Sequence, residues 1–435
     1  MFEKLQNIFR VPVLKRKILF TVAMLCVYRL GGHIPTPGVN SEALVAAFAH
    51  QTNSLFGLYD LFVGGSFAKA TVFALGIMPY ISVSIIFQLL GAVIPYFEKL
   101  QKEGEEGRKK ITQYTRVGTV ALAMVQSLAF AKFLTSMGSA GAPVVPHPGV
   151  GFLLMTMITQ TTGTILIMWL GEQITERGIG NGISLIIFIG IVARFPADII
   201  NTIRVLRAGT LSPVVAALMV IIMIGVIAAV VAMTQASRKI PVQYAKRVVG
   251  NKMFGGQSTN IPLRINTAGV IPIIFAQSLI MLPGTLALYF GGNAMIQGIA
   301  GLFTHGTWVY VVVYSLTIIF FTYFYTAIVL NPTDMADNIK KFGGFVPGIR
   351  PGRKTAEYMD RILSRITLPG AIFLALIAVL PDILIRKFNI PFYFGGTSVL
   401  IVVGVALDTL QQIETHLIAR HYEGFVTHGR MRGRR

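Results

Sequence analysis

Residues 55–94 read LFGLYDLFVGGSFAKATVFALGIMPYISVSIIFQLLGAVI, and this stretch decides how the rest of the chain is interpreted. It is about twice as long as the ~20 apolar residues that one helix needs to cross a bilayer. A Gly-Gly-Ser run and Lys69 interrupt it. We therefore expect two pieces. A short piece from about Phe56 to Val63 is too short to span, and a long piece from about Ala70 to Val93 can span.

The short piece indicates function as well as topology. Half-length segments inside membrane proteins are re-entrant or interfacial, and they persist only where protein or water satisfies their backbone polar groups. A re-entrant segment that dips into a cavity implies a channel or a transporter. The composition alone leaves one alternative open, which is an interfacial helix that lies flat on the membrane.

The composition places the chain among helical membrane proteins. Of its 435 residues, 54% are hydrophobic and 13% are charged, whereas soluble proteins carry about 25% charged residues. Apolar runs recur along nearly the whole length, with no long soluble domain between them. We expect an all-α polytopic membrane protein with ten transmembrane helices, at about 18–30, 70–93, 117–137, 151–174, 183–195, 213–234, 268–290, 309–330, 366–384 and 398–417.

The distribution of basic residues predicts the orientation of these helices. Most of the 38 Lys and Arg lie in the N-terminal segment, in the tail, and in the loops after spans two, four, six and eight. Cytosolic loops carry such an excess, so both termini are expected in the cytosol. The same rule accounts for most of the net charge of +20 without nucleic acid. The opposite side carries Lys69, Arg194, Arg204, Arg207, Arg386 and Lys387.

Ten spans divide into two sets of five, and an odd number per set lets the second half cross the membrane in the opposite sense. This arrangement allows an inverted repeat with a functional cavity near the interface of the halves. The expected divisions are a cytosolic interfacial segment at 1–17, an N-terminal half at 18–205, a C-terminal half at 206–419 with basic cytosolic loops at 238–264 and 331–365, and a basic cytosolic tail at 420–435.

Catalysis and ion coupling find little support in the sequence. The single cysteine, Cys26, lies in a span, so neither a disulfide framework nor a thiolate metal site is expected. Histidines and carboxylates do not cluster at ligand spacing, and no nucleotide-binding loop or catalytic dyad is visible. We therefore expect no enzyme, metal or cofactor. Only one carboxylate, Asp408, lies well inside a span, where a helix-packing hydrogen bond outweighs a proton-relay role.

Isoleucines recur beside helix-breaking residues in several spans. In GIMPYIS, Pro79 frees the carbonyl of Leu75 and predicts a kink. A ring of isoleucines meeting at a waist would exclude water, and hydrophobic constrictions close pores by dewetting. Ordinary packing in isoleucine-rich helices explains the same residues. The candidates are Ile77 and Ile81 around Pro79, Ile183 and Ile187 after a glycine-rich turn, Ile274 in GVIPIIF, and Ile401 in span ten.

Eight short motifs occur in order from span two to span ten. They are FALGIMPYIS at 73–82, EGEEGRKKITQYTR at 103–116, GEQITERGIGNGIS at 171–184, VQYAKR at 242–247, GVIP at 269–272, NPTDMADNIKK at 331–341, FVPGIRPG at 345–352 and PFYFGGTS at 391–398. Taken together, they resemble the SecY family of bacterial protein-translocation channels. No single motif suffices, but the ordered set is specific and covers essentially the whole chain.

The resemblance implies a fold of ten spans in two inverted, pseudo-symmetric halves around an hourglass pore. The half-length segment then matches the family's plug, at about 56–67, and the six isoleucines match its pore ring. Spans two and three against seven and eight would form a lateral gate to lipid. The matching plug residues are Phe56, Gly57, Leu58, Tyr59, Asp60, Leu61, Phe62, Val63, Gly64 and Gly65.

The resemblance also implies a function and partners. It implies a preprotein-conducting channel of the general secretory pathway in the bacterial plasma membrane, which also releases hydrophobic segments sideways into lipid. Its implied partners are the small membrane subunits SecE and SecG, the SecA motor ATPase, the ribosome, the preprotein and the lipid bilayer. The two long basic loops would bind SecA or the ribosome through Lys246, Arg247, Arg350, Arg353 and Lys354.

Two other functions stay open on the residues alone. An ion-coupled secondary transporter built on an inverted repeat would need a polar site at the midplane, for which Asp408 is the candidate. A non-conducting scaffold would have no need of the segment at 56–67.

Overall fold

The structure is a computed structural model of the 435-residue chain. The chain forms two compact units. The first comprises Met1–Asn201, Ser278–His305 and Val405–Arg435, and the second comprises Thr202–Gln277 and Gly306–Gly404. The described residues are 11–49, 59–60, 62–139, 142–209, 212–244, 247–249, 252–254, 258–289, 307–388 and 396–428.

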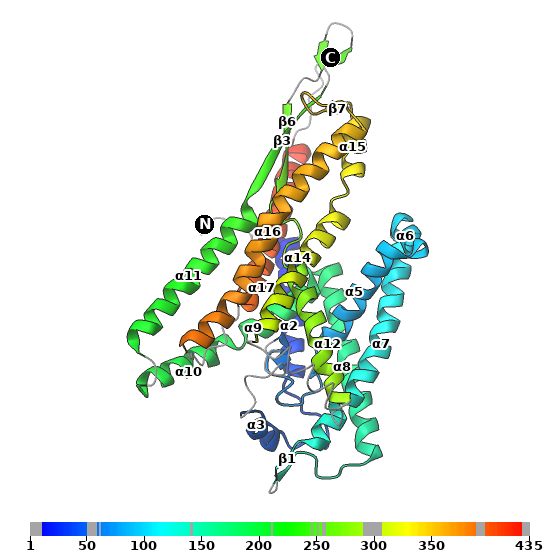
Figure 1. The fold of residues 1–435 in the computed structure, drawn as a ribbon. Coiled ribbons are helices and arrows are strands. Elements are labelled where there is room, and N and C mark those ends of the chain that lie inside the picture. Colours follow the sequence, from blue (N-terminus) through cyan, green and yellow to red (C-terminus); the bar gives the residue numbers. More distant parts are fainter. Residues whose placement is uncertain are drawn as a thin grey trace. The chain divides into compact units, whose positions relative to one another are not determined.

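A helix covers most of each of the ten predicted spans (Figure 1). Within the described residues, seven helices are long and apolar enough to cross a membrane. The number is eight if α5 (Met78–Val93) and α6 (Pro95–Lys102), which meet at a bend of 99°, form one span. The mostly helical fold confirms the predicted all-α class, whereas the count of ten spans stays a prediction.

The first unit consists mainly of helices. Helix α7 packs along both α5 and α8, and α8 also packs along α9 (Figure 1). Helix α10 belongs to this unit up to Asn201 and to the second unit from Thr202 onward. Besides α5 and α6, the elements are α2 (Pro12–Gly31), α3 (Ser41–Ala49), α7 (Glu105–Ser136), β1 (Gly138–Ser139), β2 (Ala142–Pro143), α8 (Val150–Arg177), α9 (Gly182–Val192) and α10 (Phe195–Arg207).

The predicted second span begins later than expected. Residues 70–77 form turns, and α5 starts at Met78 with Pro79 in its first turn. Proline lacks an N–H and has a fixed φ, and both properties suit the first turn of a helix. Pro79 therefore begins a helix, and the predicted kink at this residue is wrong. The positive φ angles of Ala70 (43°) and Gly76 (56°) hold the preceding segment outside the helical region.

The second unit combines membrane helices with a small sheet. Its elements are α11 (Pro213–Gln235), β3 (Ser237–Tyr244), β4 (Arg247–Val249), β5 (Lys252–Phe254), β6 (Ser258–Arg264), α12 (Ile271–Tyr289), α14 (Trp308–Val329), α15 (Pro332–Lys341), β7 (Gly344–Phe345), α16 (Arg353–Phe388) and α17 (Gly396–His428). The first unit includes α12 from Ser278 onward and α17 from Val405 onward.

Several helices start at residues that the sequence marks as caps. The side chains of Asn181, Ser212, Thr307 and Asn331 each accept a hydrogen bond from a backbone N–H in the first turn of α9, α11, α14 and α15. Such caps satisfy donors that have no partner within the helix. Proline follows the cap in α11 and α15, where its fixed φ favours helix initiation.

Both predicted basic loops contain regular structure, including strands that the expected all-α class did not include. The loop at 238–264 forms an antiparallel ribbon of β3 and β6, and β7 from the other loop pairs with β3 (Figure 1). Along β3, buried Ile240 and Val242 alternate with exposed Lys239 and Pro241. This period of two buries one face of the ribbon.

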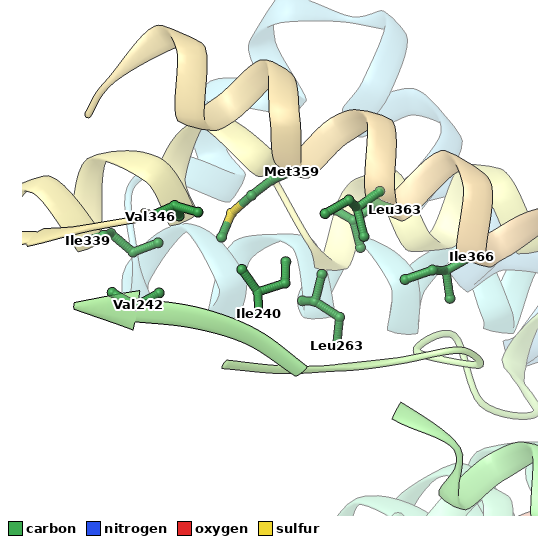
Figure 2. Packing of buried hydrophobic residues seen from close by; sticks show 9 residues of the cluster. Ile240, Val242, Leu263, Ile339, Val346, Met359, Leu363 and Ile366 are labelled. Carbon is green, nitrogen blue, oxygen red and sulfur yellow. The ribbon is translucent and has the colours of Figure 1, made fainter. Parts of the chain in front are cut away.

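A hydrophobic core lies between that face and two helices. Figure 2 shows side chains of the strands directed toward side chains of α16, with α15 beside them. The core ties the two basic loops into one body within the second unit. Its buried residues are Ile240, Val242, Leu263, Ile339, Val346, Met359, Ile362, Leu363 and Ile366.

Candidate functional site

The segment predicted as a plug is partly described. Tyr59, Asp60, Phe62 and Val63 are buried, and Gly64 follows in a turn. The predicted plug residues Phe56, Gly57, Leu58 and Leu61 lie outside the described residues.

Tyr59 connects this segment to the start of α5. Its hydroxyl donates a hydrogen bond of 2.7 Å to the carbonyl of Leu75, three residues before α5 begins. Its ring lies 4.9 Å from that of Phe67, which in turn lies 4.8 Å from Phe130 of α7. A buried carbonyl outside a helix needs such a donor, and the Tyr59 hydroxyl supplies it.

Asp60 makes three polar contacts although its exposed fraction is only 7%. Its Oδ2 accepts a hydrogen bond of 2.8 Å from Nη1 of Arg194, which follows α9. Its Oδ1 accepts one of 2.8 Å from the N–H of Ala68, and its carbonyl accepts one of 2.9 Å from the N–H of Gly65. Asp60 therefore both shapes the turn at 60–68 and binds the residue after α9.

Glycine allows the turn to lie directly against α9. Gly64 has φ = +70°, and a Cβ at this position would lie 2.9 Å from Cα of Gly190. The Gly64 carbonyl accepts a 3.5 Å hydrogen bond from Nη1 of Arg29 at the end of α2. Only a residue without a side chain combines this backbone conformation with this approach.

The start of α9 is held by two other helices. The N–H of Gly180 donates 2.9 Å to Oε1 of Gln412 in α17, and the N–H of Ile179 donates 3.0 Å to Oγ1 of Thr21 in α2. Ile179 also packs in a small cluster with Leu14 of α2. Helix α9 is thus anchored at both of its ends within the first unit.

Each candidate pore-ring isoleucine lies within the first two turns of its helix or at its cap, on α5, α9, α12 and α17. The structure brings Ile77 and Ile81 together one turn apart, and likewise Ile183 and Ile187. The other two belong to the second unit, and the meeting of all six in one ring stays a prediction. Ile183 is half-buried, and the others are at most 6% exposed: Ile77, Ile81, Ile187, Ile274 and Ile401.

Among the candidate partner-binding residues, Arg350 is the most clearly presented. It is exposed in the turn between β7 and α16, where Gly348 (φ = +81°) and Gly352 (φ = +101°) reverse the chain. Its carbonyl accepts a hydrogen bond of 2.9 Å from the Thr355 hydroxyl. Within the described part of the chain its guanidinium makes no ion pair. Lys246 lies outside the described residues, and of Arg247 only its place in β4 is described.

Arg353 and Lys354 both pair with Glu357 one turn further along α16, at 3.3 and 3.0 Å. These pairs lie outside the predicted ninth span. The hydrogen bond from Lys354, with the charge of Arg353, lowers the pKa of the Glu357 carboxyl. Because Glu357 partly neutralises both cations, Arg350 is the stronger candidate for binding an acidic partner surface.

One ion pair joins two of the membrane helices of the first unit. Arg116 of α7 forms two hydrogen bonds with Glu172 of α8, at 2.8 and 2.7 Å. Asp408, the candidate for ion coupling, is an exposed residue on α17. Across the described ranges, no group of three His, Cys, Asp or Glu side chains is placed to hold a metal ion.

Two residues of this site were not identified from the sequence. The sequence shows Arg194 only as one of the charges on the predicted outer side, and it gives no signal for Gln412. Opposite charges at Asp60 and Arg194 on the same predicted side were a signal that could have suggested their pairing. Nothing in the sequence linked Gln412 to the glycine-rich turn, since 232 residues separate it from Gly180.

Comparison with known proteins gives one consistent result. The family model of SecY matches residues 71–410. The protein translocase subunit SecY of Aquifex aeolicus is 48% identical over 428 residues, covering 98% of this chain and 100% of that protein. The protein translocase subunit SecY of Escherichia coli K12 is 45% identical over 423 residues, covering 97% and 95%.

Solved structures show a similar fold at low sequence identity. A structure of a protein-conducting channel aligns with a TM-score of 0.66 and 18% identity over 93% of each chain. Sec61 in a canine ribosome–channel complex aligns with a TM-score of 0.64 and 17% identity, also over 93% of each chain.

Proposed function

The chain belongs to the SecY family and is a protein-conducting membrane channel, not an enzyme, and we propose that six isoleucines and a plug near 56–67 close it. The observation that carries the proposal is the burial of five isoleucines, each near the start of one of four helices. Aliphatic side chains exclude water at a constriction. They also bind no class of side chain strongly, which suits a passage for unfolded chains of any sequence.

The plug assignment is supported by the short segment that precedes α5. Tyr59 and Asp60 have tertiary hydrogen-bond partners, so the segment has a defined seat within the first unit. A similar structure is described as one in which the plug domain stabilises the closed state and maintains a membrane seal. We extend that role to this chain. With the plug displaced and the isoleucines moved aside, an unfolded preprotein would pass.

The basic ribbon and the Arg350 turn are proposed to bind the partner that drives translocation. They share one hydrophobic core, so force on either reaches the same body. The ribosome is one such partner, because similar channel structures were solved on ribosomes. SecA is the other, and SecE and SecG are the proposed small subunits. We place the channel in the bacterial plasma membrane with both termini in the cytosol, on the positive-inside rule. Lateral release through spans two, three, seven and eight is part of the same proposal.

A crosslinking experiment tests the pore. Ile81→Cys and Ile187→Cys are made separately in a Cys26→Ser background, reconstituted with the motor, and loaded with a stalled secretory chain that carries a single cysteine, and an added oxidant then forms a disulfide between cysteines that lie close together. Both positions are expected to crosslink to the chain. Ile221→Cys is the matched control, because Ile221 is an isoleucine of α11 with an exposed fraction of 66%. Absence of crosslinks at both Ile81 and Ile187 with a competent motor, or equal yield at Ile221, contradicts the proposed pore.

A further inference from the structure

We propose that Arg194 is a positioning residue for the closed channel, and that its ion pair with Asp60 couples the position of α9 to the seating of the plug. The inference rests on the proposed function, because it takes the segment that begins near residue 56 as the plug. It concerns contacts that all lie within the first unit.

The first observation is how Asp60 is used. Its Oδ1 and its carbonyl bind N–H groups of its own turn, at Ala68 and Gly65, and only Oδ2 reaches outward to Arg194. The side chain of Asp60 is 9% exposed and that of Arg194 is 31% exposed. The turn is therefore a preformed unit, and the ion pair is the polar link from that unit to the residue after α9.

The second observation is the close contact beside the pair. Gly64 lies against Gly190, four residues before Arg194. Two backbones in direct contact leave no side chains between them to deform. A shift of the last turn of α9 is therefore transmitted directly to the turn at 60–68.

The third observation is what else α9 carries. This helix has only 11 residues, and its first two turns hold Ile183 and Ile187. Its other end is held by Thr21 and Gln412. Movement of α9 that withdraws Ile187 also moves Gly190 and Arg194 away from the plug. Opening of the ring and release of the plug then become one event.

Release of the plug does not leave the Arg194 guanidinium without a nearby negative charge. Asp198 lies one helical turn beyond Arg194 and also interacts with it electrostatically. Breaking a partly buried pair is costly mainly because one charge is left without a partner. The pair with Asp60 favours the closed state. Because Asp198 still interacts with Arg194 after that pair breaks, the open state stays accessible when a substrate engages the channel.

The test measures ion conductance of the reconstituted complex in a planar bilayer, without motor or substrate. Arg194→Gln and Asp60→Asn are each expected to raise the resting open probability by roughly tenfold, which corresponds to about 1.4 kcal/mol of lost closed-state stability. The double variant is expected to conduct no more than the leakier single variant, since residues of one pair are not additive. Arg194→Lys keeps the positive charge and is expected to have a resting open probability close to that of the unchanged protein.

A second readout follows the seat of the plug itself. In the Cys26→Ser background, Gly32→Cys and Ser66→Cys are introduced together, because a Cβ on Gly32 lies 3.1 Å from the Ser66 Oγ. The disulfide is expected to form several-fold more slowly when Arg194→Gln is added. Arg204→Gln is the matched control, an exposed arginine on α10 in the same stretch of chain.

The outcomes distinguish a failure of the proposed Asp60–Arg194 coupling from a failure of the proposed channel function. If Arg194→Gln matches Arg204→Gln in both conductance and disulfide rate, the proposed role of the Asp60–Arg194 pair is contradicted. It is also contradicted if the effects of the two single variants add in the double variant. In either case, a secretory chain that still crosslinks at Ile187→Cys leaves the proposed function standing. Loss of that crosslink in the otherwise unchanged protein contradicts the proposed function instead.

Discussion

Gln160 of α8 donates a hydrogen bond of 2.7 Å from its side-chain amide to the backbone carbonyl of Thr71. The same nitrogen donates one of 2.8 Å to the hydroxyl of Thr36, and Gln160 is fully buried. Residues 70–77 form turns before α5, so only some of their backbone groups find partners within the segment, and others are satisfied by more distant residues. Gln160 is one of these residues. A side chain of α8 thus contributes to holding the turns that precede α5.

Replacing Gln160 with leucine should destabilise the protein. The substitution removes two hydrogen bonds, one to the buried Thr36 hydroxyl and one to the Thr71 carbonyl, which keeps the N–H of Ala74 as a donor. Each such bond is worth about 0.5–1.5 kcal/mol. We expect a lower melting temperature of the purified complex in detergent. Gln113→Leu is the control, because Gln113 is exposed on α7. Equal melting temperatures for the two variants would show that the Gln160 hydrogen bonds are not needed.

A methyl group at Gly163 should displace the same segment. A Cβ at this position of α8 would collide with the carbonyl oxygen of Val72. Because a backbone atom cannot rotate away, Gly163→Ala should cost about 1–3 kcal/mol through overpacking. The same change at Gly225 of α11 meets no atom within 4 Å and should be neutral or stabilising, since alanine is favoured over glycine inside helices. Thermal unfolding of both variants decides whether α8 packs directly on this segment.

Truncating a side chain in the hydrophobic core under the ribbon of β3 and β6 should loosen that ribbon without unfolding the membrane helices. Ile240 is 1% exposed and packs against Met359 of α16 in the core shown in Figure 2. Ile240→Ala should destabilise that core by about 2–5 kcal/mol. Limited proteolysis should then cut the loop at 238–264 faster. Lys239→Ala, at the exposed neighbouring position, should leave the rate of cleavage as it is.

Charge reversal at Arg350 should weaken binding of the driving partner. Because this guanidinium is exposed and makes no ion pair among the described residues, Arg350→Glu should raise the Kd for SecA or the ribosome by about tenfold at low salt. The difference should shrink as salt is added. Lys341→Glu, an exposed charge in the same loop, is the control. A Kd equally affected by both variants would indicate a general effect of charge and no specific site at Arg350.

The sequence predicted the membrane class, the approximate positions of the helices and the short segment before α5, because long apolar runs and their breaks are local properties. It missed the strands of the cytosolic loops. Ribbon pairing joins residues as distant as Gln243 and Phe345, and such register has no local signal. It also placed the start of α5 eight residues too early, because residues 70–77 are as apolar as a helix.

The sequence by itself determined that this chain is a helical membrane protein and that it belongs with protein-conducting channels, and it predicts that most of the positive charge lies on one side. Hydrophobicity and charge act through composition, so they can be read without coordinates. The tertiary structure alone decided which partners hold Tyr59, Asp60 and Gly64. Asp60 meets Arg194 across 134 residues, Tyr59 meets Leu75, and Gly64 fits against Gly190 only once the helices have packed. These contacts depend on distances of a few ångströms between parts of the chain that no local pattern connects.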